Sequence, residues 1–582
     1  MSRPAASPRP AFFLAMGLLL VLAICLGPGL IFGLSHYADV AHLRHVRYHD
    51  ATFRYLPIPL TPAGYAQAKL AWLGLTLLGS TVLLWQWRRR GRLYRELAAL
   101  HREWRAAPPL LAPWRRLRPA ERRTALLLFG ALLLVRSYYL LRYPLYGDEV
   151  VTYLSFVRAG GLAAVSFYPI PNNHIGYSLI CWLFSLVSPN FYWATRLPTF
   201  LLSALGTAGV GLLLLRHVNF RVAALTVFLF GFFPYALFQS VVGRGYFLLA
   251  VCAQLGFLAV LTLLRRPMRP RLAWALLVGS SVVGLYAMPS YLLVFGSLLA
   301  GLAADFLWQQ RPARLWSLGL AGMVVGGAAA LLYAPVLLVS GPRALLANGY
   351  VAPGAGYTAG LTALDFLART EGQLLGAGPL GLAVVGGLSL AGLLLGYRQR
   401  ALLPLVLLAL GLLWLPYLPL LLRGVYPPAR VLSYRVFFLF LLAALLLETG
   451  LRWPPLAALR RRPVLSVALP VLAWAGVAVL LFQRRATQEA ARNERVTHSY
   501  AWLRAHGARR VLVEAPHYQL YLQFFSQTNH TGLRIDAATA AEPGARYQFY
   551  LLDKEQYRKF RIPLPVVFEN EDIRIYRWPT PR

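Results

Sequence analysis

Long apolar runs, separated by short polar or arginine-rich stretches, recur along most of this chain. A helix needs roughly 20 residues to cross the hydrocarbon core of a bilayer, which is about 30 Å thick. The runs are close to this length and predict about thirteen membrane spans in a mainly α-helical, polytopic protein. They fall near residues 11–34, 70–87, 124–141, 197–215, 222–241, 246–264, 272–288, 290–308, 315–339, 373–397, 401–422, 431–449 and 464–482.

One apolar run is too short to be a span. It extends from Ile175 to Val187, and as a helix it would reach only about 20 Å. The stretch before it, Tyr168-Pro-Ile-Pro-Asn-Asn-His174, is rich in proline. We therefore expect loop 142–196 to hold two helices at the membrane surface, one beginning at Asp148 and one after His174, with the Pro-Asn-Asn-His turn between them.

The chain changes composition abruptly after residue 482. Short runs rich in apolar and aromatic residues predict strands at 511–514, 533–536, 547–552 and 573–576. A helix is predicted at 518–525. This part of the sequence has no glycine-rich phosphate loop, metal-ligand cluster or nucleophile elbow. We expect a small α/β domain with an accessory role.

Basic residues predict the orientation of the bundle. The connector 88–123 carries twelve arginines, whereas loop 35–69 carries three arginines and one lysine. Arginine and lysine near membrane ends are retained in the cytoplasm, so this connector is predicted to be cytoplasmic. By parity, loops 35–69, 142–196 and 340–372 and the tail after 482 lie outside. The net charge of +37 is therefore attributed to topology and membrane lipids, and no nucleic-acid partner is expected.

Acidic residues are scarce in the membrane part. Of 21 Asp and Glu residues, ten follow residue 482. Asp148 and Glu149 are adjacent and belong to the surface loop. One interpretation is local, because Asp148 is a good N-cap residue and Glu149 in a first helical turn favours the helix dipole. The other is catalytic: one carboxylate acts as general base on a hydroxyl, and its neighbour tunes its pKa or holds an acceptor or metal.

Four motifs, in their order along the chain, resemble the signature of the GT-C integral-membrane glycosyltransferases. Among these the protein mannosyltransferase and aminoarabinose transferase type is the most similar. The motifs are Arg136-Ser-Tyr-Tyr-Leu-Leu-Arg-Tyr-Pro-Leu-Tyr-Gly-Asp-Glu149, Pro171-Asn-Asn-His174, Thr195-Arg-Leu-Pro198 and Gly243-Arg-Gly-Tyr246. The resemblance implies a GT-C fold with a membrane catalytic domain at 124–482. Two N-terminal spans and the basic connector (1–123) precede it, and the external α/β domain (483–582) follows.

The resemblance also implies an activity. Such enzymes transfer a sugar from a polyprenyl-phosphate donor to a lipid, glycan or protein acceptor on the outer face of the membrane, here with inversion. By this resemblance Asp148 is the catalytic base and Glu149 assists it. The expected location is the bacterial inner membrane, with the active site and the C-terminal domain in the periplasm.

A glycosyl phosphate needs cations near the departing phosphate. Arg244 is the first candidate, because arginine can bind phosphate through two hydrogen bonds. The alternative to a phosphate-binding role, for Arg244 and for the other arginines, is a side chain at the membrane interface that reaches the lipid headgroups. For the Asn-Asn-His stretch the alternative is a turn and a helix cap. The expected substrate-binding residues are Arg244, His174, Asn172, Asn173, Tyr246, Arg136, Arg196 and Arg435, with Arg430 a further outer-end candidate.

A histidine-rich stretch raises the question of a metal. His36, Asp39, His42, His45, His49 and Asp50 have helical spacing that could place several ligands on one face. Histidines near lipid headgroups are commoner, so no metal is assigned to the site. The sequence assigns no cofactor, and a divalent metal ion is left open.

Two alternative functions also fit many spans. A non-enzymatic lipid or glycan transporter often shows inverted repeats, which the sequence lacks. A polysaccharide polymerase or ligase is closer to the leading interpretation.

Overall fold

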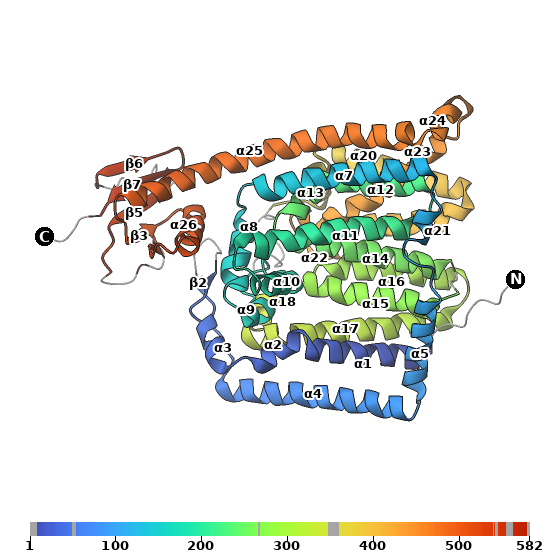
Figure 1. Cartoon of the computed structure of the whole chain (residues 1–582), viewed down its shortest axis with the longest axis horizontal. Coiled ribbons are helices and arrows are strands. Elements are labelled where there is room, and N and C mark those ends of the chain that lie inside the picture. Colours follow the sequence, from blue (N-terminus) through green and yellow to red (C-terminus); the bar gives the residue numbers. More distant parts are fainter. Residues whose placement is uncertain are drawn as a thin grey trace.

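A computed structural model of the chain describes residues 9–48, 54–265, 268–346, 360–538, 541, 545–554 and 563–578. Most helices lie alongside one another in one bundle, and a small α/β domain extends from one end of it (Figure 1). In this described part, eleven helices are long and apolar enough to cross a membrane, and two bent helix pairs raise the number to as many as thirteen. The predicted fold class, a polytopic helix bundle with a C-terminal α/β domain, is confirmed.

The spans follow the apolar runs, and most extend beyond them. For example, α4 begins at Pro62 rather than near 70, because Thr61 caps it by accepting a hydrogen bond from the Gly64 N–H (3.1 Å). The unbent spans are α4 Pro62–Arg88, α7 Pro119–Arg142, α11 Leu197–Leu214, α14 Tyr246–Leu264, α15 Pro270–Ala287, α16 Tyr291–Trp308, α17 Leu315–Val339, α20 Leu380–Arg398, α21 Leu403–Trp414 with α22 Tyr417–Arg423, α23 Val436–Gly450 after η6 Ala429–Arg435, and α25 Leu469–Ala505.

Two predicted spans are bent. α1 Pro10–Leu26 and α2 Pro28–Leu34 meet at 42°, and α12 Phe220–Phe232 and α13 Pro234–Val241 meet at 66°. Each second helix begins with a proline, which has no N–H to continue the ladder of hydrogen bonds. Hydropathy does not register such a break, because the run stays apolar through it. The sharper bend redirects the chain toward residues 243–246.

The surface loop 142–196 is more helical than predicted. α8 (Gly147–Thr152) passes into the π-helical turn η1 (Tyr153–Val157), and α10 (Ile175–Ser185) is the short apolar helix expected after His174. A further helix, α9 (Gly161–Ser166), lies between them. It was not predicted, because its six small and apolar residues are too few to show a helical period.

The C-terminal domain contains a five-stranded sheet within the described residues, in the order β4-β3-β5-β7-β6. β3 pairs in parallel with β4 and β5, and β7 pairs antiparallel with β5 and β6. The four predicted strands are found, and β6 was missed because it is an exposed edge strand with little alternation. The elements are β3 Arg510–Val513, α26 Pro516–Thr528, β4 Arg534–Ala537, β5 Phe549–Asp553, β6 Val566–Glu569 and β7 Ile573–Arg577.

One continuous helix joins the bundle to this domain. α25 has 37 residues and is therefore about 55 Å long, well beyond the thickness of a hydrocarbon core. Its first half completes the bundle and its second half reaches the sheet (Figure 1). The helix continues past residue 482, where the apolar run ends.

The two ends of the bundle differ in chemistry. α5 (Arg92–Arg105), from the arginine-rich connector, lies at one end, and α8 and the C-terminal domain lie at the other (Figure 1). Arg271 at the start of α15 pairs with Glu96 (2.7 Å) and Glu103 (3.1 Å) of α5, which anchors the connector to the bundle. The structure therefore separates the connector from the surface loop as predicted, and the assignment of the outer face stays a prediction.

Candidate active site

A cavity of about 890 Å³ lies where the bundle meets the C-terminal domain. The bundle and its surface loop contribute Asp148, Asn172, His174, Arg244, Tyr246 and Arg430, among others. α26, the end of β5 and the turn between β6 and β7 line the same cavity. The domain that was predicted to be accessory therefore forms part of the wall.

Asp148 is in the first turn of α8, and its side chain is 29% exposed. Its Oδ2 atom is 3.5 Å from Nη2 of Arg244 and 3.7 Å from Nη2 of Arg430. The N-cap of α8 is Tyr146, so Asp148 does not take the capping role that was its alternative. The cavity thus holds a carboxylate flanked by two guanidinium groups.

Glu149 is fully buried and is not among the residues that line this cavity. Arg196 donates two hydrogen bonds to Glu149, from Nε to Oε2 (3.1 Å) and from Nη2 to Oε1. The backbone N–H groups of Tyr146 (3.1 Å, to Oε1) and Gly243 (3.0 Å, to Oε2) also donate to it. These four bonds tie the start of α8 to the segment that carries Arg244. The contacts support a positioning role for both Glu149 and Arg196.

The glycines beside Arg244 allow a close approach of backbone segments. A Cβ atom at Gly243 would lie 2.8 Å from Cβ of Thr195, and one at Gly245 would lie 2.9 Å from Cβ of His174. With no side chains there, the Arg244 guanidinium packs against the surface loop. It donates to the backbone oxygen of Asp148 (3.2 Å) and to the Oδ1 atom of Asn172.

His174 and Tyr246 line the cavity beside Arg244. The Gly245 N–H donates to Nδ1 of His174 (2.8 Å), so a neutral ring carries its proton on Nε2. Burial, and then the neighbouring arginines, hold the pKa of His174 well below its usual value. Nε2 lies 3.3 Å from Nη2 of Arg244. Two N–H donors therefore face one region, which suits an anionic acceptor such as phosphate.

Arg430 completes this group of donors. Its Nε donates to the Tyr246 hydroxyl (3.1 Å), and its side chain is 36% exposed. Arg430 was only a secondary candidate from the sequence, because nothing in its motif distinguishes it from other arginines at span ends. It is more accessible than Arg244, whose guanidinium is buried among four oxygen acceptors.

The remaining predicted residues do not line the cavity. Asn173 donates to the carbonyls of Ala164 (3.2 Å) and Phe167 (2.7 Å), which fixes the turn before α10. Arg435 pairs with Glu371 (2.8 Å) in a separate buried network. Of the two, neither contacts Asp148 among the interactions of the described residues.

Arg136 is buried inside the bundle. It donates to the backbone oxygens of Ser203 (3.0 Å) and Gly231 (3.3 Å) and to the Thr207 hydroxyl (3.1 Å). Gly231 lies just before the bend between α12 and α13, where carbonyls lose their helical donors. Arg136 therefore stabilises the bend that leads the chain to Arg244.

Tyr168 is a cavity residue that sequence reasoning missed as a binding candidate. Its side chain is 3% exposed, and among the described interactions its hydroxyl has no hydrogen-bond partner. Burial raises the pKa of Tyr168, so the hydroxyl keeps its proton. It can donate to a molecule bound in the cavity.

The backbone before Asp148 is held by both parts of the protein. The Leu145 carbonyl accepts hydrogen bonds from the Tyr521 hydroxyl (2.9 Å) and from Nδ2 of Asn493 (2.9 Å) in the C-terminal domain and α25. Arg196 holds the carbonyls of the two preceding residues at 2.7 and 2.8 Å. The position of Asp148 is therefore fixed from the bundle and from the domain.

The histidine-rich stretch forms no metal site in the part of the chain that is described. No group of three or more His, Cys, Asp or Glu side chains there could hold a metal ion. Within this stretch, the His36 N–H donates to Asp39 (2.7 Å) at the start of α3 (Tyr37–Leu43). His49 and Asp50 lie outside the described residues.

A solved structure has a similar fold. ArnT from Cupriavidus metallidurans bound to undecaprenyl phosphate matches 78% of this chain and 97% of its own, with a TM-score of 0.52 and 14% sequence identity. The chain has the GT-C fold. Neither a protein-family model nor a curated protein matches the sequence, so the GT-C fold is recognised from structure and confirms the resemblance seen in the motifs.

Two further structures match less closely. Apo ArnT from the same organism covers 78% of this chain and 97% of its own at a TM-score of 0.49 and 14% identity. The arabinosyltransferase EmbB from Mycobacterium smegmatis covers 73% of this chain and 45% of its own at a TM-score of 0.41 and 13% identity.

Proposed function

We propose that this protein is an inverting glycosyltransferase that moves a sugar from a polyprenyl-phosphate donor to a hydroxyl acceptor at the outer face of the membrane. The observation that carries the proposal is the Asp148 carboxylate between Arg244 and Arg430 in a large cavity at one end of a GT-C bundle. The undecaprenyl phosphate bound to ArnT supports a donor of this class.

The chemistry follows from these groups. Asp148 takes the proton from the acceptor hydroxyl, whose oxygen attacks the anomeric carbon of the sugar. The bond from that carbon to the phosphate oxygen breaks on the opposite side, which inverts the centre. Arg430, Arg244 and the Nε2 proton of His174 stabilise the phosphate that departs.

Donor binding should depend on Arg430. We expect Arg430→Ala to weaken the binding of undecaprenyl phosphate by about tenfold, because it removes an accessible charged donor. The affinity of the full-length protein in detergent, measured by microscale thermophoresis, checks this. Arg423→Ala is the control, since Arg423 is an exposed arginine at the end of α22 that does not line the cavity. Equal affinities in the two variants would mean that the phosphate is held elsewhere.

Turnover should depend on the contact between the domain and the backbone before Asp148. We expect Tyr521→Phe to lower the rate of sugar transfer about fivefold, because loss of one hydrogen bond costs about 1 kcal/mol and here displaces the base. Undecaprenyl phosphate affinity should not change. Tyr500→Phe removes another hydrogen-bonded tyrosine hydroxyl, one that is not in the cavity lining, and should leave the rate unaltered. Equal rates in both variants would argue against the positioning role.

The proposed orientation places the cavity in the periplasm. We expect single cysteines at Arg158 and Asn529 to react with a membrane-impermeant maleimide in intact cells, and one at Ala106 not to react. All three positions are exposed, and the native Cys25, Cys181 and Cys252 are buried, so background labelling is low. Labelling at Ala106 alone would place Asp148 in the cytoplasm and contradict the proposed donor.

A further inference from the structure

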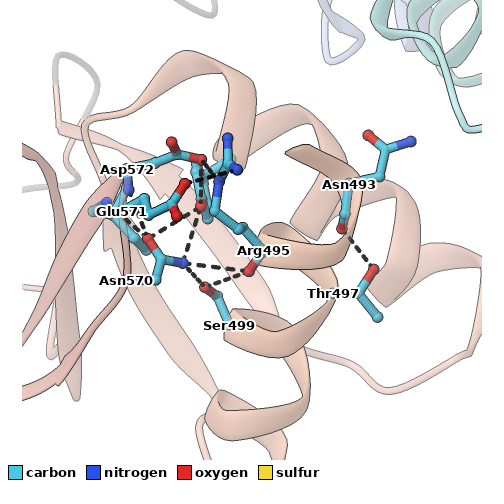
Figure 2. Close-up of polar contacts among 9 residues, drawn as sticks. Asn493, Arg495, Thr497, Ser499, Asn570, Glu571 and Asp572 are labelled. Carbon is cyan, nitrogen blue, oxygen red and sulfur yellow. Dashed lines mark hydrogen bonds and ion pairs between the residues drawn. The ribbon is translucent and has the colours of Figure 1, made fainter. Parts of the chain in front are cut away.

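The wall that the C-terminal domain contributes to the cavity has a rigid polar edge. This edge is the turn Asn570-Glu571-Asp572 between β6 and β7. Asn570 organises it: Oδ1 accepts the N–H of Asp572 (2.9 Å) and of Ile573 (3.0 Å), and Nδ2 donates to the Ser499 hydroxyl of α25 (3.1 Å; Figure 2). The turn is therefore fixed to the helix that continues into the membrane.

Arg495 of α25 holds both carboxylates of the turn (Figure 2). Its Nε donates to Asp572 (2.8 Å) and its Nη1 to Glu571 (3.0 Å), and the Tyr518 hydroxyl donates to Asp572 (3.1 Å). The side chains nevertheless remain 31% exposed for Asp572 and 81% exposed for Glu571. A carboxylate accepts about four hydrogen bonds, so both can accept more from a molecule in the cavity.

A second observation points to a polar ligand in the cavity. Tyr168, on the bundle side of the same cavity, is only 3% exposed, and its hydroxyl has no hydrogen-bond partner among the described residues. Buried polar side chains are normally paired, so this hydroxyl is available to donate a hydrogen bond to a molecule in the cavity. His517 and Tyr518 at the start of α26 add aromatic side chains to the lining.

Resting on the proposed function, we propose that this wall binds the acceptor, and that the acceptor is a saccharide without negative charge. Fixed carboxylates accept hydrogen bonds from sugar hydroxyls and lose little entropy in doing so. The same carboxylates repel phosphate or uronate groups. Lys554 also lines the wall, but it is paired with Glu569 (2.6 Å).

Arg492 on α25 lines the cavity too and would attract an anion. Binding of an anionic saccharide therefore tests whether repulsion by the carboxylates or attraction by Arg492 is the stronger effect. The probes are chitotetraose, which is neutral, its fully deacetylated form, which is cationic, and tetragalacturonate, which is anionic. Undecaprenyl phosphate reports on the donor side.

We expect full-length protein in detergent to bind the neutral and cationic tetramers more tightly than the anionic one. Glu571→Ala should weaken binding of chitotetraose about three- to tenfold, the cost of one or two hydrogen bonds, and leave undecaprenyl phosphate affinity unchanged. Glu494→Ala is the matched control, because Glu494 is an exposed acid on α25 outside the cavity lining. Its affinities should equal those of the parent.

Tighter binding of tetragalacturonate, no binding of any tetramer, or equal chitotetraose affinities in the Glu571 and Glu494 variants would overturn the acceptor assignment. Failure of undecaprenyl phosphate to bind the parent would instead overturn the proposed donor. The two results are separate, because each uses its own ligand on the same preparation.

Discussion

Asp148→Asn is expected to abolish sugar transfer while the protein still folds and binds undecaprenyl phosphate. The change keeps the shape of the side chain and removes the base, a loss that typically lowers a rate by about 10² to 10⁴. The carboxylate is part of the cavity lining and lies 3.5 Å from Arg244 and 3.7 Å from Arg430. Mass spectrometry of envelope glycolipids and glycans, from cells that lack the gene and carry either version, measures the product.

The control for this experiment is Asp365→Asn, the same chemical change at an exposed acid of α19 (Ala363–Leu375) that does not line the cavity. It should restore the missing sugar as fully as the parent. Loss of a general base should reduce the product far more than about threefold. If Asp148→Asn restores the missing sugar to within about threefold of the parent, Asp148 is not the base. The missing sugar itself identifies the group that is transferred.

Glu149→Gln should destabilise the protein strongly. It leaves Arg196 without its buried partner, and breaking a buried ion pair in this way typically costs about 3 to 5 kcal/mol. Both side chains are fully buried. A lower midpoint of thermal unfolding in detergent, with less protein recovered from membranes, is the expected measurement. An unchanged midpoint would show that the hydrogen bonds to Glu149 survive in the amide.

Glu371→Gln separates stability from activity. Glu371 forms a comparable buried pair with Arg435 (2.8 Å) away from the cavity lining. Both variants should lower the unfolding midpoint. Only Glu149→Gln should lower the rate of transfer per folded molecule, because Glu149 also holds the Gly243 N–H beside Arg244 (3.0 Å). Equal rates per folded molecule would limit Glu149 to a structural role.

The bundle was predictable because membrane spans leave a long apolar record in the sequence. The bends at Pro28 and Pro234 left none, since the runs stay apolar through them. The edge strand β6 was missed for the opposite reason: its exposed residues carry no alternation of burial. Hydropathy predicts which segments are buried in lipid, and it does not predict where backbone hydrogen bonding is interrupted.

The site was predicted unevenly. The residue type and order in the motifs pointed to Asp148, Arg244 and His174, which the structure brings together at the cavity. Arg136 and Arg435 share the same sequence signal, an arginine near a span end, and are instead buried in other networks. Only the fold distinguishes such arginines, because their partners are backbone carbonyls or a distant glutamate. Nothing in the sequence predicted that the C-terminal domain forms part of the cavity wall.

Because α25 is unbroken, it limits which insertions the chain can tolerate between the bundle and the C-terminal domain. A helix turns by about 100° and rises about 1.5 Å with each residue, so one inserted residue between the last span and the sheet would rotate the whole domain away from α8. Contacts such as Tyr521 to Leu145 could not be kept. The length of α25 therefore sets both the rotation and the distance between the bundle and the C-terminal domain. Insertions should be tolerated only as whole helical turns, and only where another contact compensates for the added length.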